Sequence, residues 1–253
     1  MSKENTAVTK KKMKRCKEDV VFDTACFIIL TLVLFVVAYP LYWVIISSIS
    51  APSAVSSGKV LLHPIGFTLK GYAEVFKNDQ VMRGFLNSLI ITFCGVMVNL
   101  IVTLPTSYAL SRSNFSGKKP ITIFYLITMF FGGGLIPTYL LINNIGLLDS
   151  MWAVILPGAF SVWNMIIART YYQGIPRELR EAADVDGASE MRYFFSILLP
   201  VCMPVVAVLA LWQFVAMWNS YFDAFIYLSD KSRFPLQVVL RNILILNQLD
   251  MSA

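Results

Sequence analysis

The residues of this chain that could take part in acid–base or ionic chemistry gather in one segment, from Ile175 to Pro200. Neither hydrolysis nor metal chemistry fits it, because the only histidine, His63, lies elsewhere and no GxSxG motif is present. The chain also lacks the GxxxxGK[ST] motif of a phosphate-binding loop. We therefore predict no catalytic residue and no metal site, but a charged segment that works in water: Arg177, Glu178, Arg180, Glu181, Asp184, Asp186, Glu190 and Arg192.

The composition places this charged segment in a membrane protein. The 253 residues are 57% hydrophobic and only 14% charged, and the mean hydropathy is +0.66, whereas soluble domains are about 25% charged. The net charge of +6 does not indicate a nucleic-acid partner, because the basic excess lies in the first seventeen residues, where it serves as a topology signal. Cys16, Cys26, Cys94 and Cys202 are scattered and predict free thiols.

Five uncharged runs are long enough to cross about 30 Å of hydrocarbon. The predicted fold is therefore an all-α polytopic membrane bundle with spans at Thr24 to Ile46, Phe85 to Leu110, Ile121 to Ile142, Met151 to Ala168 and Leu198 to Tyr221. With the N-terminus inside, the inner segments hold fourteen Lys and Arg residues and the outer segments seven. This difference predicts a cytoplasmic N-terminus and a cytoplasmic Ile175 to Pro200 segment.

The same pattern divides the chain into three parts. Residues 1–23 form a basic cytoplasmic N-terminus, residues 24–221 a transmembrane domain, and residues 222–253 an extracytoplasmic segment. In the first outer loop, Leu69 to Val81 has the apolar spacing of a helix lying along the membrane surface, and the stretch after Phe234 has similar amphipathic spacing.

Local signals divide the charged segment into two helices. Pro176 suits the first turn of a helix, and Arg177 with Glu181 and Arg180 with Asp184 are spaced four residues apart. Gly187 then predicts a bend. After it, an apolar stripe is expected to lead into the fifth span: Ala188, Met191, Phe195 and Leu198.

These residues carry a family resemblance. A run of residues resembles the EAA signature of permease subunits of bacterial ABC importers: Glu181-Ala182-Ala183, Asp186-Gly187-Ala188, then Phe194 or Phe195, Ile197, Leu199 and Pro200. The Ile-Pro-Arg-Glu-Leu lead-in and Trp218 to Phe222 resemble carbohydrate importers of the maltose-permease type. Gly132 to Pro137 and Phe234 to Gln237 are similar to the subgroup that handles complex oligosaccharides.

The resemblance implies an oligosaccharide importer in the bacterial cell membrane, in which this chain forms half of the pathway. Its implied partners are a second permease, a dimer of ATP-binding subunits that holds ATP and Mg, an extracytoplasmic solute-binding protein and membrane lipid, with no nucleic acid. The charged segment would be a coupling helix that contacts the ATPase through Glu178, Glu181, Ala182, Ala183, Asp186, Gly187 and Ala188. Family members usually have a sixth span, which this sequence is expected to lack.

The substrate pathway has two open interpretations. Gly133 and Gly134, before Pro137, predict a helix break that either lines a cavity or allows close helix packing. Trp163, Trp212, Trp218 and Asn219 are candidates for sugar contact, although interfacial or packing roles are typical of such tryptophans. The alternatives to a permease are a stand-alone secondary carrier or a membrane scaffold; the lack of charges at mid-membrane disfavours the carrier.

Overall fold

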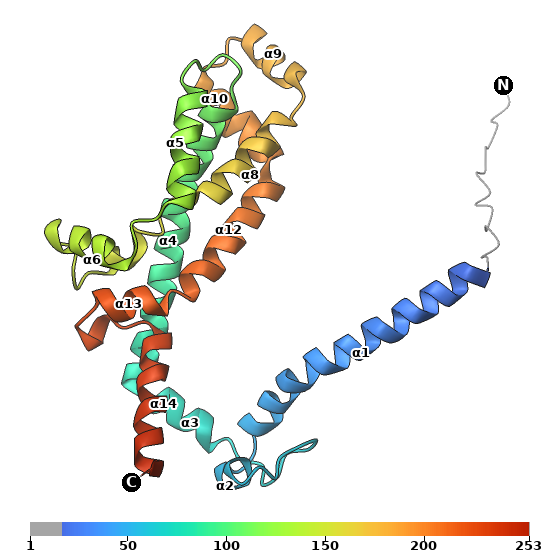
Figure 1. The fold of residues 1–253 in the computed structure, drawn as a ribbon, viewed down its shortest axis with the longest axis vertical. Helices are drawn as coiled ribbons and strands as arrows, with labels where there is room; N and C mark the ends of the chain where they lie inside the picture. Colours follow the sequence, from blue (N-terminus) through green and yellow to red (C-terminus); the bar gives the residue numbers. More distant parts are fainter. Residues whose placement is uncertain (1–16, 253) are drawn as a thin grey trace. The chain divides into compact units, whose positions relative to one another are not determined.

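The computed structural model describes residues 17–252, and within this range the regular structure is helical throughout (Figure 1). The chain separates between Lys77 and Asn78 into two compact units. Since the sequence has long apolar runs and few charges, helices are the expected way to satisfy its backbone in a bilayer. The prediction of an all-α membrane bundle is confirmed.

The first unit consists of one long helix and a short loop region that folds onto its end. Helix α1 (Lys17–Ser48) is followed by α2 (Pro52–Ser56) and α3 (Lys70–Lys77). Near the end of α1, the Tyr42 hydroxyl donates to the Leu62 carbonyl at 2.6 Å and the Trp43 indole donates to the Val60 carbonyl at 2.8 Å. The expected surface helix to Val81 stops at Lys77, because the Asn78 side chain caps the next helix.

Helix α4 (Asp79–Ser111) is the central element of the second unit, and α8 (Val162–Gln173), α12 (Met203–Trp218) and α14 (Leu236–Ser252) pack against it (Figure 1). A row of buried polar side chains follows one of its faces. Its members are Ser88, Thr92, Asn99, Thr103 and Ser107, separated by four or seven residues. This spacing places them on one side of the helix, where they face protein rather than lipid.

The predicted count of five spans is not confirmed. By length and composition, α1 and α4 qualify as spans, and two bent pairs raise the number to four within the described residues. One pair is α5 (Lys118–Phe130) with α6 (Leu135–Asn144), bent by 112°. The other joins α10 (Glu190–Tyr193), η1 (Phe194–Leu198) and α11 (Leu199–Val201) to α12, bent by 81°. Pro204 explains this second bend, since it offers no N–H to the carbonyl four residues earlier.

The run predicted as the fourth span is divided into α7 (Met151–Ile155) and α8 by a non-helical stretch around Pro157. Two amide side chains satisfy the carbonyls of this stretch. Asn99 on α4 donates to the Ala159 carbonyl at 3.2 Å, and Gln213 on α12 donates to the Gly158 carbonyl at 3.0 Å. Irregular backbone is tolerated at membrane depth where protein groups supply such bonds.

We expect Asn99→Leu and Gln213→Leu each to lower the free energy of unfolding by about 1–3 kcal/mol, because each leaves a partly buried carbonyl without a donor. Asn143→Leu, at an exposed position on α6, should change it little. Denaturant unfolding of the purified protein in detergent gives the comparison. Equal stability of all three variants would show that the amides do not hold this stretch.

The last part of the unit comprises α13 (Tyr221–Tyr227), η2 (Lys231–Arg233) and α14. The first turns of α14 pack on α4 with Val238 and Val239 buried, rather than lying free along a membrane surface. Before α7, Asp149 accepts backbone hydrogen bonds from Asp230 at 2.9 Å and Ser229 at 3.0 Å. These bonds, with Arg233 nearby, lower the pKa of the Asp149 carboxyl. The carboxylate is therefore ionised at neutral pH and keeps accepting from the segment after α13.

Candidate functional site

The charged segment folds as a helix, a glycine bend and a second helix, which confirms the local prediction. Helix α9 (Arg177–Val185) begins after Pro176, which occupies the capping position rather than the first turn, and Gly187 adopts a φ of +69°. Only glycine takes this left-handed conformation without strain. Ser189 then caps α10 by accepting a hydrogen bond from the Arg192 amide.

The candidate coupling residues are not all on the same surface. Glu178, Glu181, Ala182, Asp186 and Gly187 are exposed, and Ala188 is partly buried. Ala183 is only 3% exposed and packs into the core of this chain with Leu198 and Tyr193. Ala183 is therefore unavailable to a partner, and its small side chain instead lets α9 approach its own bundle.

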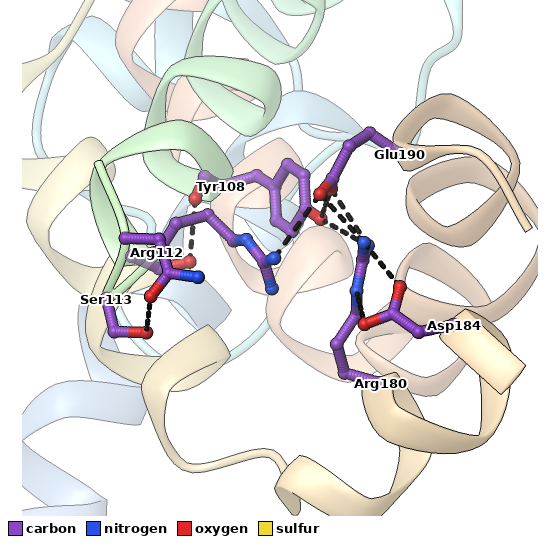
Figure 2. Close-up of polar contacts among 8 residues, drawn as sticks. Tyr108, Arg112, Ser113, Arg180, Asp184 and Glu190 are labelled. Atoms are coloured by element: carbon purple, nitrogen blue, oxygen red, sulfur yellow. Dashed lines mark hydrogen bonds and ion pairs between the residues drawn. The ribbon is translucent and has the colours of Figure 1, made fainter.

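A cluster of polar side chains joins α9 to two other elements (Figure 2). The Arg180 guanidinium donates to both carboxylate oxygens of Glu190, at 2.7 and 2.8 Å, and forms an ion pair with Asp184 at 2.7 Å. Figure 2 shows Arg180 between the two carboxylates. This bidentate arrangement is the strongest geometry for an ion pair between arginine and a carboxylate. No ion pair joins Arg177 to Glu181 among the described residues.

Two residues at the end of α4 complete the cluster from a distant part of the chain. The Tyr108 hydroxyl donates to Glu190 at 2.5 Å, and Arg112 forms an ion pair with Glu190 at 3.3 Å. The Arg180 guanidinium also lies 4.8 Å from the centroid of the Tyr193 ring. We call these five residues the Arg180 cluster: Tyr108, Arg112, Arg180, Asp184 and Glu190.

The apolar stripe predicted after Gly187 is only half right. Ala188 and Leu198 pack into the core, but Met191 and Phe195 are exposed, and Tyr193 and Phe194 are buried against α4 and α8 in their place. Residues 194–198 form a wider helical turn, η1, with five-residue hydrogen-bond spacing. Such a turn contains one residue more than the α-helical repeat and so rotates the buried face.

A polar cavity of about 490 Å³ lies between α9 and the ends of α4 and α8. Its lining includes four basic residues, Arg112, Lys118, Arg177 and Arg180, and two acidic ones, Glu181 and Asp184. The cavity means that α9 stands away from the bundle along part of its length. Among the described residues, no group of three or more His, Cys, Asp or Glu could hold a metal ion.

The candidate pathway residues lie on separate elements. Gly133 and Gly134 form the break between α5 and α6, with Gly134 at a φ of +85°. The predicted break is confirmed, but these glycines are exposed rather than enclosed by this chain's own bundle. Among the residues that the structure describes, none covers Gly133 or Gly134, so either earlier interpretation requires a neighbouring molecule.

The aromatic candidates fall into two groups. Trp163 on α8 is 57% exposed and Trp212 on α12 is 46% exposed, so both remain available for contact with another molecule. Trp218 instead packs against Phe85 and Phe214, and the Asn219 amide donates to the Val215 carbonyl at the end of α12. These contacts give Trp218 and Asn219 clear structural roles.

None of the five members of the Arg180 cluster was a predicted site residue; Arg180, Asp184 and Glu190 lie in the predicted charged segment, whereas Tyr108 and Arg112 lie outside it. Glu190 has no fixed spacing to Arg180 along a single helix, because the Gly187 bend separates them. Tyr108 and Arg112 are 72 and 68 residues before Arg180 in the sequence. One signal was available, since these two residues are four apart at the end of a predicted span, where side chains of one helix face lie together.

The comparison with known families is decisive. The family model described as a binding-protein-dependent transport system inner membrane component matches residues 17–231. The chain belongs to this family. It is thus a membrane-embedded permease subunit, and the EAA segment contains α9, Gly187 and α10.

Relatives and a solved structure agree with this assignment. The permease is 37% identical to the polygalacturonan/rhamnogalacturonan transport system permease protein YtcP of Bacillus subtilis, over 89% of this chain and 79% of the relative. It is 30% identical to the maltodextrin transport system permease protein MdxG of the same organism, over 85% and 78%. A bacterial ABC transporter that imports the acidic polysaccharide alginate contains a chain with a TM-score of 0.85 and 30% identity, covering 91% of this permease and 82% of that chain.

Proposed function

We propose that this permease forms half of an oligosaccharide import pathway and receives energy from a separate ATPase that binds α9. The observation that carries the proposal is the exposed face of α9. Glu178, Glu181 and Ala182 are exposed, with Glu181 also lining the open cavity beside α9, while Ala183 and Arg180 attach the helix to this chain. A short helix that is fixed on one side and free on the other is suited to a partner cleft.

The proposed substrate is an oligosaccharide derived from a polysaccharide. The support is that named relatives transport polygalacturonan or rhamnogalacturonan and maltodextrin, and that the structural neighbour imports alginate. Trp163 and Trp212 offer exposed aromatic surfaces on helices of the second unit, and aromatic rings stack on the apolar face of a sugar. Four further residues remain proposed for the pathway: Gly133, Gly134, Trp218 and Asn219. The proposal is weaker for Trp218 and Asn219, because both already make contacts within this chain.

The proposed assembly contains a second permease, two ATP-binding subunits that carry ATP and Mg, and an extracytoplasmic solute-binding protein. Large apolar side chains around the α5–α6 break, such as Phe130 and Phe131, are more than 70% exposed in the isolated chain. Lipid or a second permease would cover them. The N-terminus is proposed to be cytoplasmic on the basis of the excess of Lys and Arg in the segments on its side.

Co-purification tests the proposal. The tagged chain, extracted from its native membrane in mild detergent, should bring down an ATP-binding subunit that is labelled by a photoreactive ATP analogue. Glu181→Lys should lower the recovered ATPase by roughly ten-fold, because reversing a charge inside a docking surface costs on the order of 1–2 kcal/mol. Glu74→Lys, the same change at an exposed position on α3, serves as the matched control.

The outcomes distinguish a permease subunit that binds an ATPase from a stand-alone carrier. Loss of the ATPase in Glu181→Lys but not in Glu74→Lys supports docking through α9. If the parent chain recovers no ATPase and transports sugar alone in vesicles, it is a stand-alone carrier and the proposal is wrong.

A further inference from the structure

Helix α9 has few attachments to the rest of the permease. Ala183 is its one buried residue, and the cavity of about 490 Å³ separates part of the helix from α4 and α8. At its C-terminal end, Gly187 has no atom within 4 Å of the position that a side chain would occupy. Apolar packing alone therefore leaves α9 free to pivot about Gly187.

The Arg180 cluster removes this freedom. Arg180 is the member that reaches across the bend, and its side chain is only 15% exposed. Its guanidinium contacts Asp184 on α9, Glu190 on α10 and, at 3.3 Å, the hydroxyl of Tyr108 on α4. Three elements thus meet on a single planar group, which holds its partners at fixed angles because its donors form a rigid fork.

Glu190 completes the link from the other side of Gly187. It accepts from Arg180 on α9 and from Tyr108 and Arg112 at the end of α4 (Figure 2). A displacement of α9 must therefore move α4 and α10, or else break several charge-assisted hydrogen bonds. Because α10 is the first part of the bent pair that ends in α12, the displacement also reaches α12.

We propose that Arg180 and Glu190 are positioning residues that make α9, α10 and the end of α4 a single rigid body, so that movement of α9 is transmitted instead of being absorbed at Gly187. The proposal rests on the proposed function for the source of that movement. It assigns these two residues no contact with the ATPase, because the Arg180 side chain is only 15% exposed and the Glu190 carboxylate already accepts from Arg180, Arg112 and Tyr108. Loss of the cluster should thus leave the ATPase bound but lower the amount of sugar transported per ATP hydrolysed.

A purely structural role makes a different prediction. If the cluster only stabilised the fold, its loss would lower the amount of assembled complex, while each surviving complex would transport the same number of sugars per ATP. The informative quantity is consequently the ratio of sugar taken up to ATP hydrolysed, measured on complexes of equal subunit composition.

The experiment uses the complete complex in proteoliposomes with the sugar that its solute-binding protein retains. Arg180→Glu and Glu190→Arg should each lower the ratio of sugar to ATP by ~5-fold or more, the low end of measured coupling between sites. The charge-swapped double variant should recover only part of the ratio, because the reversed pair would lie beside Asp184 and Arg112, each of which then has the same charge as its new neighbour. Arg180→Lys should be intermediate, since an ammonium cannot form the fork.

Two controls make the result specific. Arg192→Glu reverses a charge in the same segment outside the cluster and should keep the parent's ratio. Hydrogen–deuterium exchange needs neither the ATPase nor transport: in the isolated chain, Arg180→Glu should speed amide exchange in residues 177–185 without changing α8 or α12.

Each outcome decides the proposal. Single variants with the parent's ratio and unchanged exchange in α9 would overturn it. Single variants that lose the ATPase as completely as Glu181→Lys would overturn it as well, by making Arg180 part of the docking surface. If no ATPase binds even the parent, the proposed function fails, whereas faster exchange in α9 would still support the rigid link itself.

Discussion

Gly187→Pro should reduce ATP-driven sugar uptake to less than about a tenth of the parent's rate while the chain still inserts into the membrane. Proline fixes φ near −65°, whereas Gly187 has a φ of +69°. Proline also removes the N–H that Gly187 donates to the Asp184 carbonyl at 3.1 Å. The direction in which α10 leaves α9 would change, and Glu190 would move away from Arg180.

A graded series at the same position isolates the backbone conformation as the cause. A Cβ atom at Gly187 would meet no other atom within 4 Å, so steric overlap does not explain the effect of alanine. Gly187→Ala should cost roughly 1–2 kcal/mol, the penalty of the left-handed conformation for an ordinary residue. Gly187→Asn should cost less, because asparagine tolerates that conformation.

Uptake of radiolabelled sugar into proteoliposomes, at matched amounts of assembled complex, measures the series. The expected order of activity is glycine, asparagine, alanine and then proline. If the proline variant transported as well as the asparagine variant, the bend at Gly187 would have no part in coupling.

Gly84→Leu should be the most destabilising single substitution in the interface between α4 and α14. A Cβ atom at Gly84 would lie 3.0 Å from Val239 Cγ2 and 3.3 Å from the Leu236 Cα atom. The second neighbour is backbone, which cannot turn aside as a flexible side chain can. Extra atoms in a packed interface typically cost about 1–3 kcal/mol.

The substitution should also break the hydrogen bonds that join the two segments. The Leu236 amide donates to Ser88 Oγ at 2.8 Å, and the Asn87 amide donates to the Phe234 carbonyl at 3.1 Å. We expect a lower midpoint of thermal unfolding in detergent and faster proteolysis after residue 233. Gly71→Leu is the matched control, because a Cβ atom at that helical glycine would meet nothing within 4 Å. Equal effects of the two variants would show that α14 does not pack closely on α4.

The membrane class and the local shape of the charged segment could be predicted because both depend on short stretches of sequence. Charged groups cannot remain in hydrocarbon, so their absence from long runs indicates membrane helices. Likewise, Arg180 and Asp184 are four residues apart on one helix, and their ion pair forms as expected. Gly187 follows the end of α9 because glycine adopts a positive φ without strain, a property of this residue alone.

The span count could not be predicted in the same way. Hydropathy measures the length of an apolar run but not whether the run forms one straight helix. Three of the five predicted runs are bent or divided. The interruption between α7 and α8 persists because distant side chains, Asn99 and Gln213, satisfy the backbone carbonyls that it leaves without helical partners.

The sequence by itself determined the family, the membrane location and the presence of a charged helix–glycine–helix segment. Only the tertiary structure decided which way that segment faces. It buries Ala183, exposes Met191 and Phe195, and brings Tyr108 and Arg112 to Glu190. The physical reason is that these contacts join residues about 80 positions apart, and the partner of a side chain is set by how whole helices pack.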